Sequence, residues 1–131
     1  MLNGVSYAHE LGYRELLEGW QASGEYPVTF VPTVSRPNDP ANADWTGRTG
    51  RVETIVGPIF KELGLSPADT VAYLCGNPDM IIAAEQTLLE LGMPEAAVKK
   101  ELYWPKGKEP RGASGADLAA AIEAAEANAD Q

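Results

Sequence analysis

One continuous apolar stripe constrains the fold of this chain more than any other feature. Apolar side chains recur at helical spacing between positions 52 and 63, at Val52, Ile55, Val56, Ile59, Phe60 and Leu63. This spacing predicts an amphipathic helix. Residues 70–74 follow as a compact apolar run without alternation, which is typical of a parallel strand buried on both faces. A helix joined closely to such a strand indicates an α/β fold.

The rest of the chain continues the alternation of short strands and helices. Residues 1–5 resemble the end of a strand, residues 7–20 have helical spacing, and residues 28–34 are rich in β-branched side chains, with a weak point at Pro32. Asn77 and Pro78 predict the start of a helix that reaches Gly92, before a last strand over residues 98–104. The order predicts an α/β fold with a Rossmann-like parallel sheet and helices on both faces, a three-layer αβα arrangement.

Composition narrows the class of protein. The 131 residues include 10 Lys and Arg against 19 Asp and Glu, a net charge of −9 that argues against nucleic-acid binding. No apolar run is long enough to cross a bilayer, and the start lacks a signal-peptide pattern. A single cysteine fits a reducing compartment. We expect a cytoplasmic domain over residues 1–104, then a linker and an alanine-rich acidic tail over residues 105–131.

Two segments that follow predicted strands contain candidate ligand-binding residues, because open α/β sheets bind ligands beyond the carboxyl ends of their strands. The first has Ser35 and Arg36 and, after a long polar loop over residues 35–50, Arg48 and Arg51. Guanidinium groups bind phosphate bidentately and a helix N-terminus favours anions, so this set suits a dinucleotide with a 2′-phosphate. Alternatively, these arginines are solvated loop charges of an acidic protein.

The second segment is Cys75, Gly76 and Asn77, where glycine allows a ligand to approach the backbone at a helix N-terminus. Cys75 either faces a bound nicotinamide or is a small buried hydrophobe. The only histidine, His9, is far away in the sequence, which argues against a Cys–His nucleophile and against a zinc site.

Glu101, Tyr103 and Trp104 stand at the end of the last predicted strand. From the residues alone, the two aromatic side chains are interpreted as an interface pair or as the edge of a core.

Taken in order, these segments resemble the bacterial ferredoxin (or flavodoxin)–NADP reductases. The resemblance covers roughly residues 2–104, and four stretches account for it: residues 3–13 (NGVSYAHELGY), residues 34–36 and 49–52 (VSR and TGRV), residues 74–80 (LCGNPDM), and residues 101–104 (ELYW). The second stretch is similar to the Ser-Arg … Gly-Arg pattern around the 2′-phosphate in that family. The third is similar to its Cys-Gly-Asn-Pro-x-Met motif.

The resemblance implies a role for each candidate residue. Ser35, Arg36 and Arg51 would bind the 2′-phosphate of NADP(H), with Arg48 as an extra candidate. Cys75 would lie near the nicotinamide C4, while Gly76 and Asn77, with Met80 of the same motif, would line the pyrophosphate side. Trp104 or Tyr103, beside Glu101, would cover the flavin ring. The implied chemistry is hydride transfer between NADPH and FAD, followed by electron transfer to a ferredoxin- or flavodoxin-type carrier.

Several departures from the family pattern stand out. Ser6 occupies a position where many members have arginine, and the chain lacks both the glycine-rich loop of the first βαβ unit and the Arg-x-Tyr-Ser segment of the flavin domain. The resemblance therefore implies an NADP(H)-binding domain that is incomplete at its N-terminal side and needs a flavin-binding half or self-association. Two alternatives are a truncated, non-catalytic interaction module and a free-standing enzyme with Cys75 as nucleophile.

Overall fold

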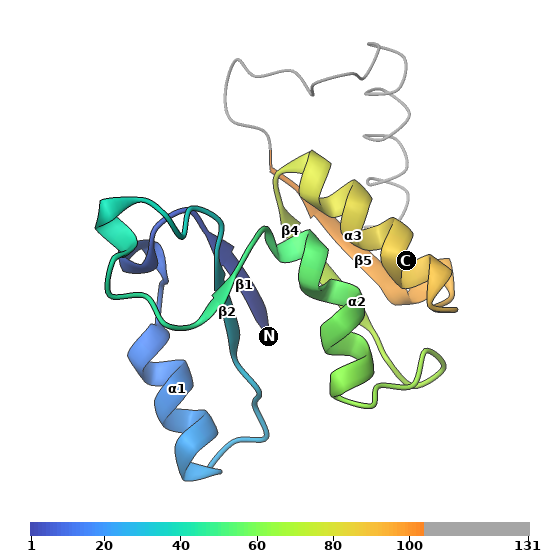
Figure 1. Ribbon diagram of the computed structural model, residues 1–131. Coiled ribbons are helices and arrows are strands. Elements are labelled where there is room, and N and C mark those ends of the chain that lie inside the picture. The colour runs from blue at the N-terminus through green and yellow to red at the C-terminus, as the bar shows by residue number, and fades with distance from the viewer. Residues whose placement is uncertain (104–131) are drawn as a thin grey trace. The chain divides into compact units, whose positions relative to one another are not determined.

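The computed structural model describes residues 1–103, in which short strands alternate with helices (Figure 1). Trp104 and the predicted tail at residues 105–131 lie outside the described residues. The elements are β1 (Leu2–Val5), α1 (Arg14–Ser23), β2 (Val31–Val34), β3 (Arg48–Thr49), α2 (Val52–Glu62), β4 (Ala72–Gly76), α3 (Pro78–Glu90) and β5 (Val98–Leu102), with short 3-10 helices η1 (Ala8–Glu10), η2 (Pro40–Asn42) and η3 (Glu95–Ala97). They divide into two compact units, residues 1–56 and residue 57 onward.

The first unit is built on a parallel sheet in the order β1-β2-β3. Its buried apolar side chains come from the segment before α1, from α1 itself, and from β2 with the residue before it: Leu11, Leu17, Phe30, Val31 and Val34. The central strand β2 pairs with β1 from Val31 onward, but with β3 only from Thr33 onward. Pro32 therefore lies where β2 has one partner strand, which a residue without an N–H group tolerates.

The predicted strand at residues 28–34 is shorter in the structure, and the predicted helix at residues 7–20 starts later. The N–H group of Phe30 donates to Oε1 of Gln21 at 2.6 Å, so the chain before Val31 is held by α1 rather than by a strand. Tyr13 has a left-handed backbone, with φ of 57°, directly before α1. Because a left-handed residue interrupts the helix, residues 7–13 form η1 and a turn, and that part of the prediction is wrong.

Gly4 marks a close contact between β1 and the start of α2. A β-carbon added at Gly4 would lie 2.6 Å from Cβ of Val52. That distance leaves no room for any side chain, because neither backbone nor Cβ can move away cheaply. The contact places the N-terminus of α2, which begins at Val52 as predicted, directly beside the sheet of the first unit.

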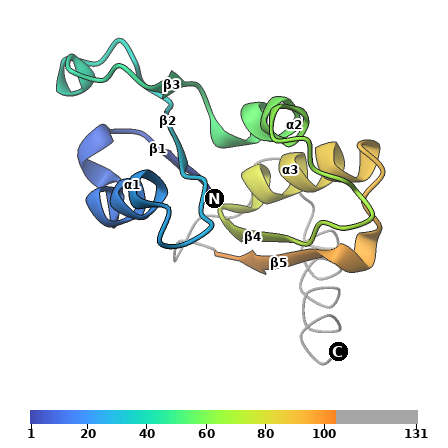
Figure 2. The same ribbon diagram turned by 90° about the horizontal axis from the view of Figure 1, so that it is seen from below.

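The second unit contains the parallel pair β4–β5, one face of which is covered by α3 (Figure 2). Its buried apolar side chains are Ile59, Phe60, Ile81, Ala84, Leu88, Met93 and Val98. Helix α3 begins as predicted, with Pro78 in its first turn and Oδ1 of Asn77 accepting from the N–H group of Met80 at 2.9 Å. Lys100 of β5 pairs with Glu85 of α3 at 2.6 Å, which fixes the helix against this strand.

The face of β4 that points away from α3 corrects the prediction of a strand buried on both faces. Strand β4 spans residues 72–76 rather than 70–74, and burial alternates along it. Tyr73 is 81% exposed and Cys75 is also exposed. The prediction was wrong because Tyr73 and Cys75 count as apolar residues in the sequence. In the part of the chain that the structure describes, no helix covers the sheet face on which they lie.

These elements confirm the Rossmann-like α/β class, since each strand pair is parallel and joined through helical or looped crossovers. Within the described residues, no helix combines the length and the apolar character that a membrane span requires.

Candidate functional site

The predicted phosphate-binding residues of the first unit leave the sheet at one end. Strands β2 and β3 are parallel, with Val34 beside Thr49. Ser35 and Arg36 follow β2, and Arg51 follows β3 after Gly50, so these residues emerge together at the carboxyl ends of neighbouring strands. The Gly50 N–H group donates to the Val34 carbonyl at 2.9 Å and extends the pairing by one step. The structure therefore brings Ser35, Arg36 and Arg51 to one edge of the sheet.

The Arg36 side chain is held by an aromatic ring. Its guanidinium carbon lies 5.6 Å from the centroid of the Tyr7 ring, and its Nη1 donates to the Tyr7 hydroxyl at 3.3 Å. On the same ring, His9 stacks at 5.7 Å between centroids. Cation–π contact orients a guanidinium group while leaving it charged. Arg36 is exposed, and its guanidinium group has these two contacts with Tyr7.

Arg51 stands at the start of α2, where the helix dipole favours an anion. Its Nε pairs with Oε1 of Glu53, and its carbonyl accepts from the Thr54 hydroxyl at 2.6 Å. The Arg51 side chain is 60% exposed and the Glu53 side chain 15%. A guanidinium fork, a serine hydroxyl and a helix N-terminus at one strand end form a donor set that suits a phosphate.

The predicted polar loop at residues 35–50 is more structured than its sequence indicates. It contains η2, whose N-cap Asp39 accepts from the Ala41 N–H group at 2.9 Å, and then strand β3. Asp39 is thus a capping residue. The strand was missed because two residues, Arg48 and Thr49, give no readable period.

Trp45 closes this loop over the backbone of β3. Its indole Nε1 donates to the Arg48 carbonyl at 2.8 Å, and the Arg14 guanidinium lies 5.1 Å from the ring centroid. A β-carbon at Gly47 would lie 2.5 Å from the Trp45 ring. Arg48 itself is exposed and stands in β3 opposite Thr33, whereas Ser35, Arg36 and Arg51 follow their strands. Arg48 is therefore placed one step away from the strand ends.

The second unit holds the other predicted segment, in which a glycine turn precedes the N-cap of α3. Gly76 has a φ of 146°, a conformation that favours glycine, and a β-carbon there would lie 2.7 Å from Cε of Met80. Asn77 caps α3. The Tyr103 N–H group donates to the Gly76 carbonyl at 2.9 Å, so Tyr103 stays beside this turn although β5 ends at Leu102, before the predicted end at residue 104.

Three of the predicted catalytic or flavin-side residues share one exposed sheet face. Cys75 of β4 lies opposite Glu101 of β5 in the register, and both are exposed. Tyr103 is 71% exposed. The interpretation of Cys75 as a buried hydrophobe is therefore wrong. Trp104, the remaining member of this group, lies outside the described residues.

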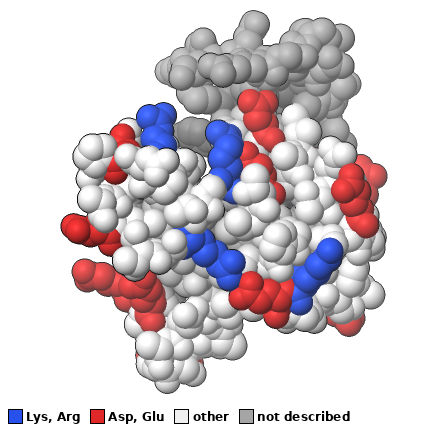
Figure 3. All heavy atoms as spheres, in the orientation of Figure 1, with Lys and Arg blue, Asp and Glu red and all other residues white. Residues whose placement is uncertain are grey.

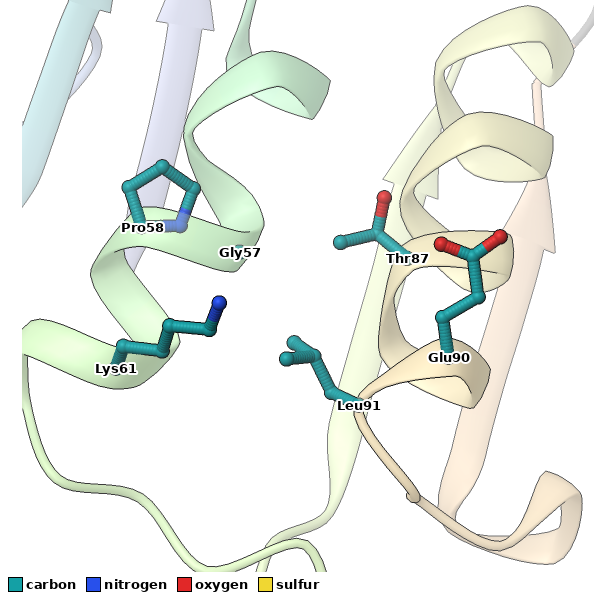
Figure 4. Close-up of a pocket in the computed structure, with 6 residues that line it drawn as sticks. All are labelled: Gly57, Pro58, Lys61, Thr87, Glu90 and Leu91. Atoms are coloured by element: carbon teal, nitrogen blue, oxygen red, sulfur yellow. The ribbon is translucent and has the colours of Figure 1, made fainter.

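The distribution of charge and one groove are further features of the surface. On the face drawn in Figure 3, basic side chains occur in separate groups among acidic ones. Among residues 1–103, no group of His, Cys, Asp and Glu is arranged to hold a metal ion. A groove of about 500 Å³ in the second unit is lined by Gly57, Pro58, Lys61, Thr87, Glu90 and Leu91 (Figure 4). None of the predicted site residues lines it.

Sequence reasoning missed three residues that shape the first segment: Tyr7, Asn42 and Trp45. Tyr7 is the first residue of the stretch with helical spacing, but in the structure it lies directly before η1. Asn42 gives no signal in a polar loop. Trp45 does give one, because a large aromatic residue in a loop that is otherwise polar indicates that the loop is packed.

Comparisons with known proteins place the chain in a family. The family model described as the oxidoreductase NAD-binding domain matches residues 1–86. Ferredoxin--NADP reductase B of Sorangium cellulosum is 29% identical over 106 residues, 79% of this chain and 41% of that protein. The phenol hydroxylase P5 protein of Acinetobacter pittii is 32% identical over 104 residues, 79% of this chain and 28% of that protein. Fruit protein pKIWI502 of Actinidia deliciosa is 33% identical over 91 residues.

A solved structure agrees. The crystal structure of a ferredoxin NADP+ reductase from Neisseria gonorrhoeae with bound FAD and NADP matches with a TM-score of 0.58 and 27% identity, over 79% of this chain and 43% of that chain. The chain belongs to the oxidoreductase NAD-binding domain family, as the NAD(P)-binding domain of ferredoxin reductase-type oxidoreductases. It spans less than half the length of these relatives.

Proposed function

We propose that this chain supplies the 2′-phosphate side and the nicotinamide side of an NADP(H) site in a ferredoxin reductase-like flavoprotein. The observation that carries the proposal is the arrangement at the ends of β2 and β3. There Ser35 and Arg36, the latter held by Tyr7, emerge at the same sheet edge as Arg51 at the start of α2. The similarity to the Neisseria gonorrhoeae reductase, whose structure contains bound NADP, and to the ferredoxin--NADP reductase of Sorangium cellulosum supports it.

The residues present fit the phosphate end of such a ligand. Two guanidinium groups and one hydroxyl can donate to a dianionic phosphate, and no acidic side chain follows β2 directly where an NAD-selective site would receive the ribose diol. The acidic side chain of Glu53 pairs with Arg51. Arg48 has a secondary role at most in this proposal, because it lies in β3 before the strand end.

The exposed face of β4 and β5 is proposed as the redox side. Gly76 brings backbone without a side chain to the start of α3, where a pyrophosphate or nicotinamide could approach closely, and Cys75 stands beside it. FAD, bound by a part outside this chain, would supply hydride acceptance and one-electron release to a ferredoxin- or flavodoxin-type carrier. Glu101 and Tyr103 would border that flavin. The cytoplasmic location expected from the sequence stays a prediction.

Calorimetric titration with 2′-phospho-AMP and with 5′-AMP at low salt tests the phosphate site. We expect the chain to bind 2′-phospho-AMP more tightly than 5′-AMP. In Arg36→Ala, the affinity for 2′-phospho-AMP should fall by about tenfold to hundredfold, because hydrogen bonds to charged groups contribute about 1.5–3 kcal/mol. Lys61→Ala, which removes the same charge from the second unit, is the matched control. Equal binding of the two nucleotides by the folded chain would remove the assignment.

The two alternatives have separate readouts. Cys75 as a nucleophile predicts a thiol that reacts far faster with iodoacetamide at neutral pH than the thiol of the urea-unfolded chain. We expect the folded and the unfolded chain to react at similar rates. Cys75 is exposed in the fold, and it has no histidine partner among the described residues. A non-catalytic interaction module predicts retained folding without any preference for 2′-phospho-AMP, and the exposed Tyr73 and Tyr103 would then form its contact surface.

A further inference from the structure

Asn42 is buried in a loop whose neighbours are exposed. It is 3% exposed. Within residues 1–103, the only other buried polar side chain is Thr33 in the sheet. A buried amide costs folding free energy unless its donors and acceptor are all hydrogen-bonded. The contacts of Asn42 therefore decide why this side chain turns inward.

Every polar atom of the Asn42 side chain has a backbone partner. Oδ1 accepts from the N–H group of Ala8 at 2.9 Å, and Nδ2 donates to the carbonyls of Ser6 at 3.0 Å and Arg36 at 2.8 Å. Ser6 and Ala8 follow β1, and Arg36 follows β2. One side chain thus joins the exits of two strands. Strands β1 and β2 are neighbours in the sheet although they are separated in the sequence (Figure 1).

The residues that Asn42 joins are the backbone around the Tyr7–Arg36 pair. Tyr7 lies between Ser6 and Ala8, and Arg36 is bonded directly through its carbonyl. The contact between the Arg36 guanidinium and the Tyr7 ring therefore depends on two chain segments that the Asn42 amide joins, one step beyond the backbone bond from the Ser35 N–H group to the Val5 carbonyl at 2.9 Å. A shift of either segment would change where the guanidinium points.

We propose that Asn42 is a positioning residue that sets the direction of Arg36, and with it the selectivity for a 2′-phosphate; this inference rests on the proposed function. Its amide is the side chain suited to the task, because it offers one acceptor and two donors at the same place. Aspartate has the same shape but would face the two carbonyls with a carboxylate. Asn42→Asp therefore removes two hydrogen bonds and keeps the volume.

The test compares Asn42→Asp with Asp39→Ala in titrations with 2′-phospho-AMP and 5′-AMP. Asp39→Ala removes the cap of η2 in the same loop but leaves the three contacts of Asn42 in place. We expect Asn42→Asp to reduce the ratio of the two affinities by about tenfold, a typical effect of misplacing one charged hydrogen bond. Asp39→Ala should keep the ratio. In the Arg36→Ala background, Asn42→Asp should have no further effect on it.

The outcomes separate this inference from the proposed function. A wild-type chain with no preference for 2′-phospho-AMP overturns both. A wild-type preference that persists in folded Asn42→Asp overturns the positioning role and leaves the phosphate site standing. If Asn42→Asp does not fold, amide exchange in the unaltered chain decides. Saturating 2′-phospho-AMP should slow exchange at Ala8 more than saturating 5′-AMP does, and equal exchange with the two nucleotides would contradict the proposal.

Discussion

The two candidate ligand segments of this chain are organised in different ways. In the first unit, the Tyr7 ring contacts the Arg36 guanidinium, Glu53 pairs with Arg51, and the buried Asn42 side chain bonds to the backbone at the two strand exits. In the second unit, the turn at Gly76 is ordered through its backbone, while Cys75 and its neighbours on the same sheet face are exposed.

The difference indicates what each segment requires beyond residues 1–103. A phosphate ligand is bound by oriented donors, and orientation is already present in the first unit. A redox centre needs a site from which water is excluded, and the described residues do not cover the face that carries Cys75. We therefore expect the first unit to bind its part of the nucleotide alone, and the second to need a covering partner.

Gly4→Ala should have the largest effect on the first unit. The new β-carbon would meet Cβ of Val52 at 2.6 Å, and such overpacking costs about 1–3 kcal/mol of unfolding free energy. Urea unfolding measures the loss, and 2′-phospho-AMP binding should weaken because the start of α2 moves. Gly19→Ala is the control: a β-carbon there meets nothing within 4 Å. It should stabilise α1 by about 0.5–1 kcal/mol.

Gly76→Ala should destabilise the second unit without changing phosphate binding. The φ of 146° is strained for alanine, which costs about 1–2 kcal/mol. The contact with Met80 adds less, because Cε is the end of a flexible side chain. Urea unfolding and 2′-phospho-AMP titration together check this. A variant that loses phosphate binding while it stays folded would contradict the separation of the two segments.

Tyr7 should matter for binding more than for folding. Tyr7→Ala removes the ring beneath Arg36 and its hydroxyl contact, and we expect about tenfold weaker binding of 2′-phospho-AMP. Tyr7→Phe keeps the ring and loses only the hydroxyl contact, so we expect binding of 2′-phospho-AMP to weaken by about twofold to threefold. His9→Ala, which removes the other ring stacked on Tyr7, is the control and should have less effect than Tyr7→Ala. Equal affinities of all three variants and wild type would show that Arg36 needs no support.

Glu53→Gln should have the smallest effect and the opposite sign. It removes a negative charge beside the proposed phosphate, while its pairing with a largely exposed Arg51 contributes only about 0–1 kcal/mol. Binding of 2′-phospho-AMP should tighten by about threefold or less. Glu18→Gln changes the same charge in the exposed pair with Arg14 and should leave the affinity unaltered. A large loss of affinity in Glu53→Gln would instead assign Glu53 a necessary orienting role.

The amino-acid sequence by itself determined those features that depend on near neighbours. The stripe from Val52 onward predicted α2, Asn77 with Pro78 predicted the start of α3, and the order of elements predicted parallel strands. The motifs around Arg36 and Cys75 also predicted the family to which the chain belongs. Periodicity, capping and short motifs are local, so a single sequence is enough to recognise them.

Only the tertiary structure decided which side chains support the site and which face of β4 stays open. Arg36 meets Tyr7 across 29 positions, and Asn42 reaches Ala8 across 34. Whether Tyr73 and Cys75 are covered depends on where α3 packs, and β3 exists because β2 offers it an edge. Contacts between distant segments arise when strands and helices pack, and local patterns contain no information about them.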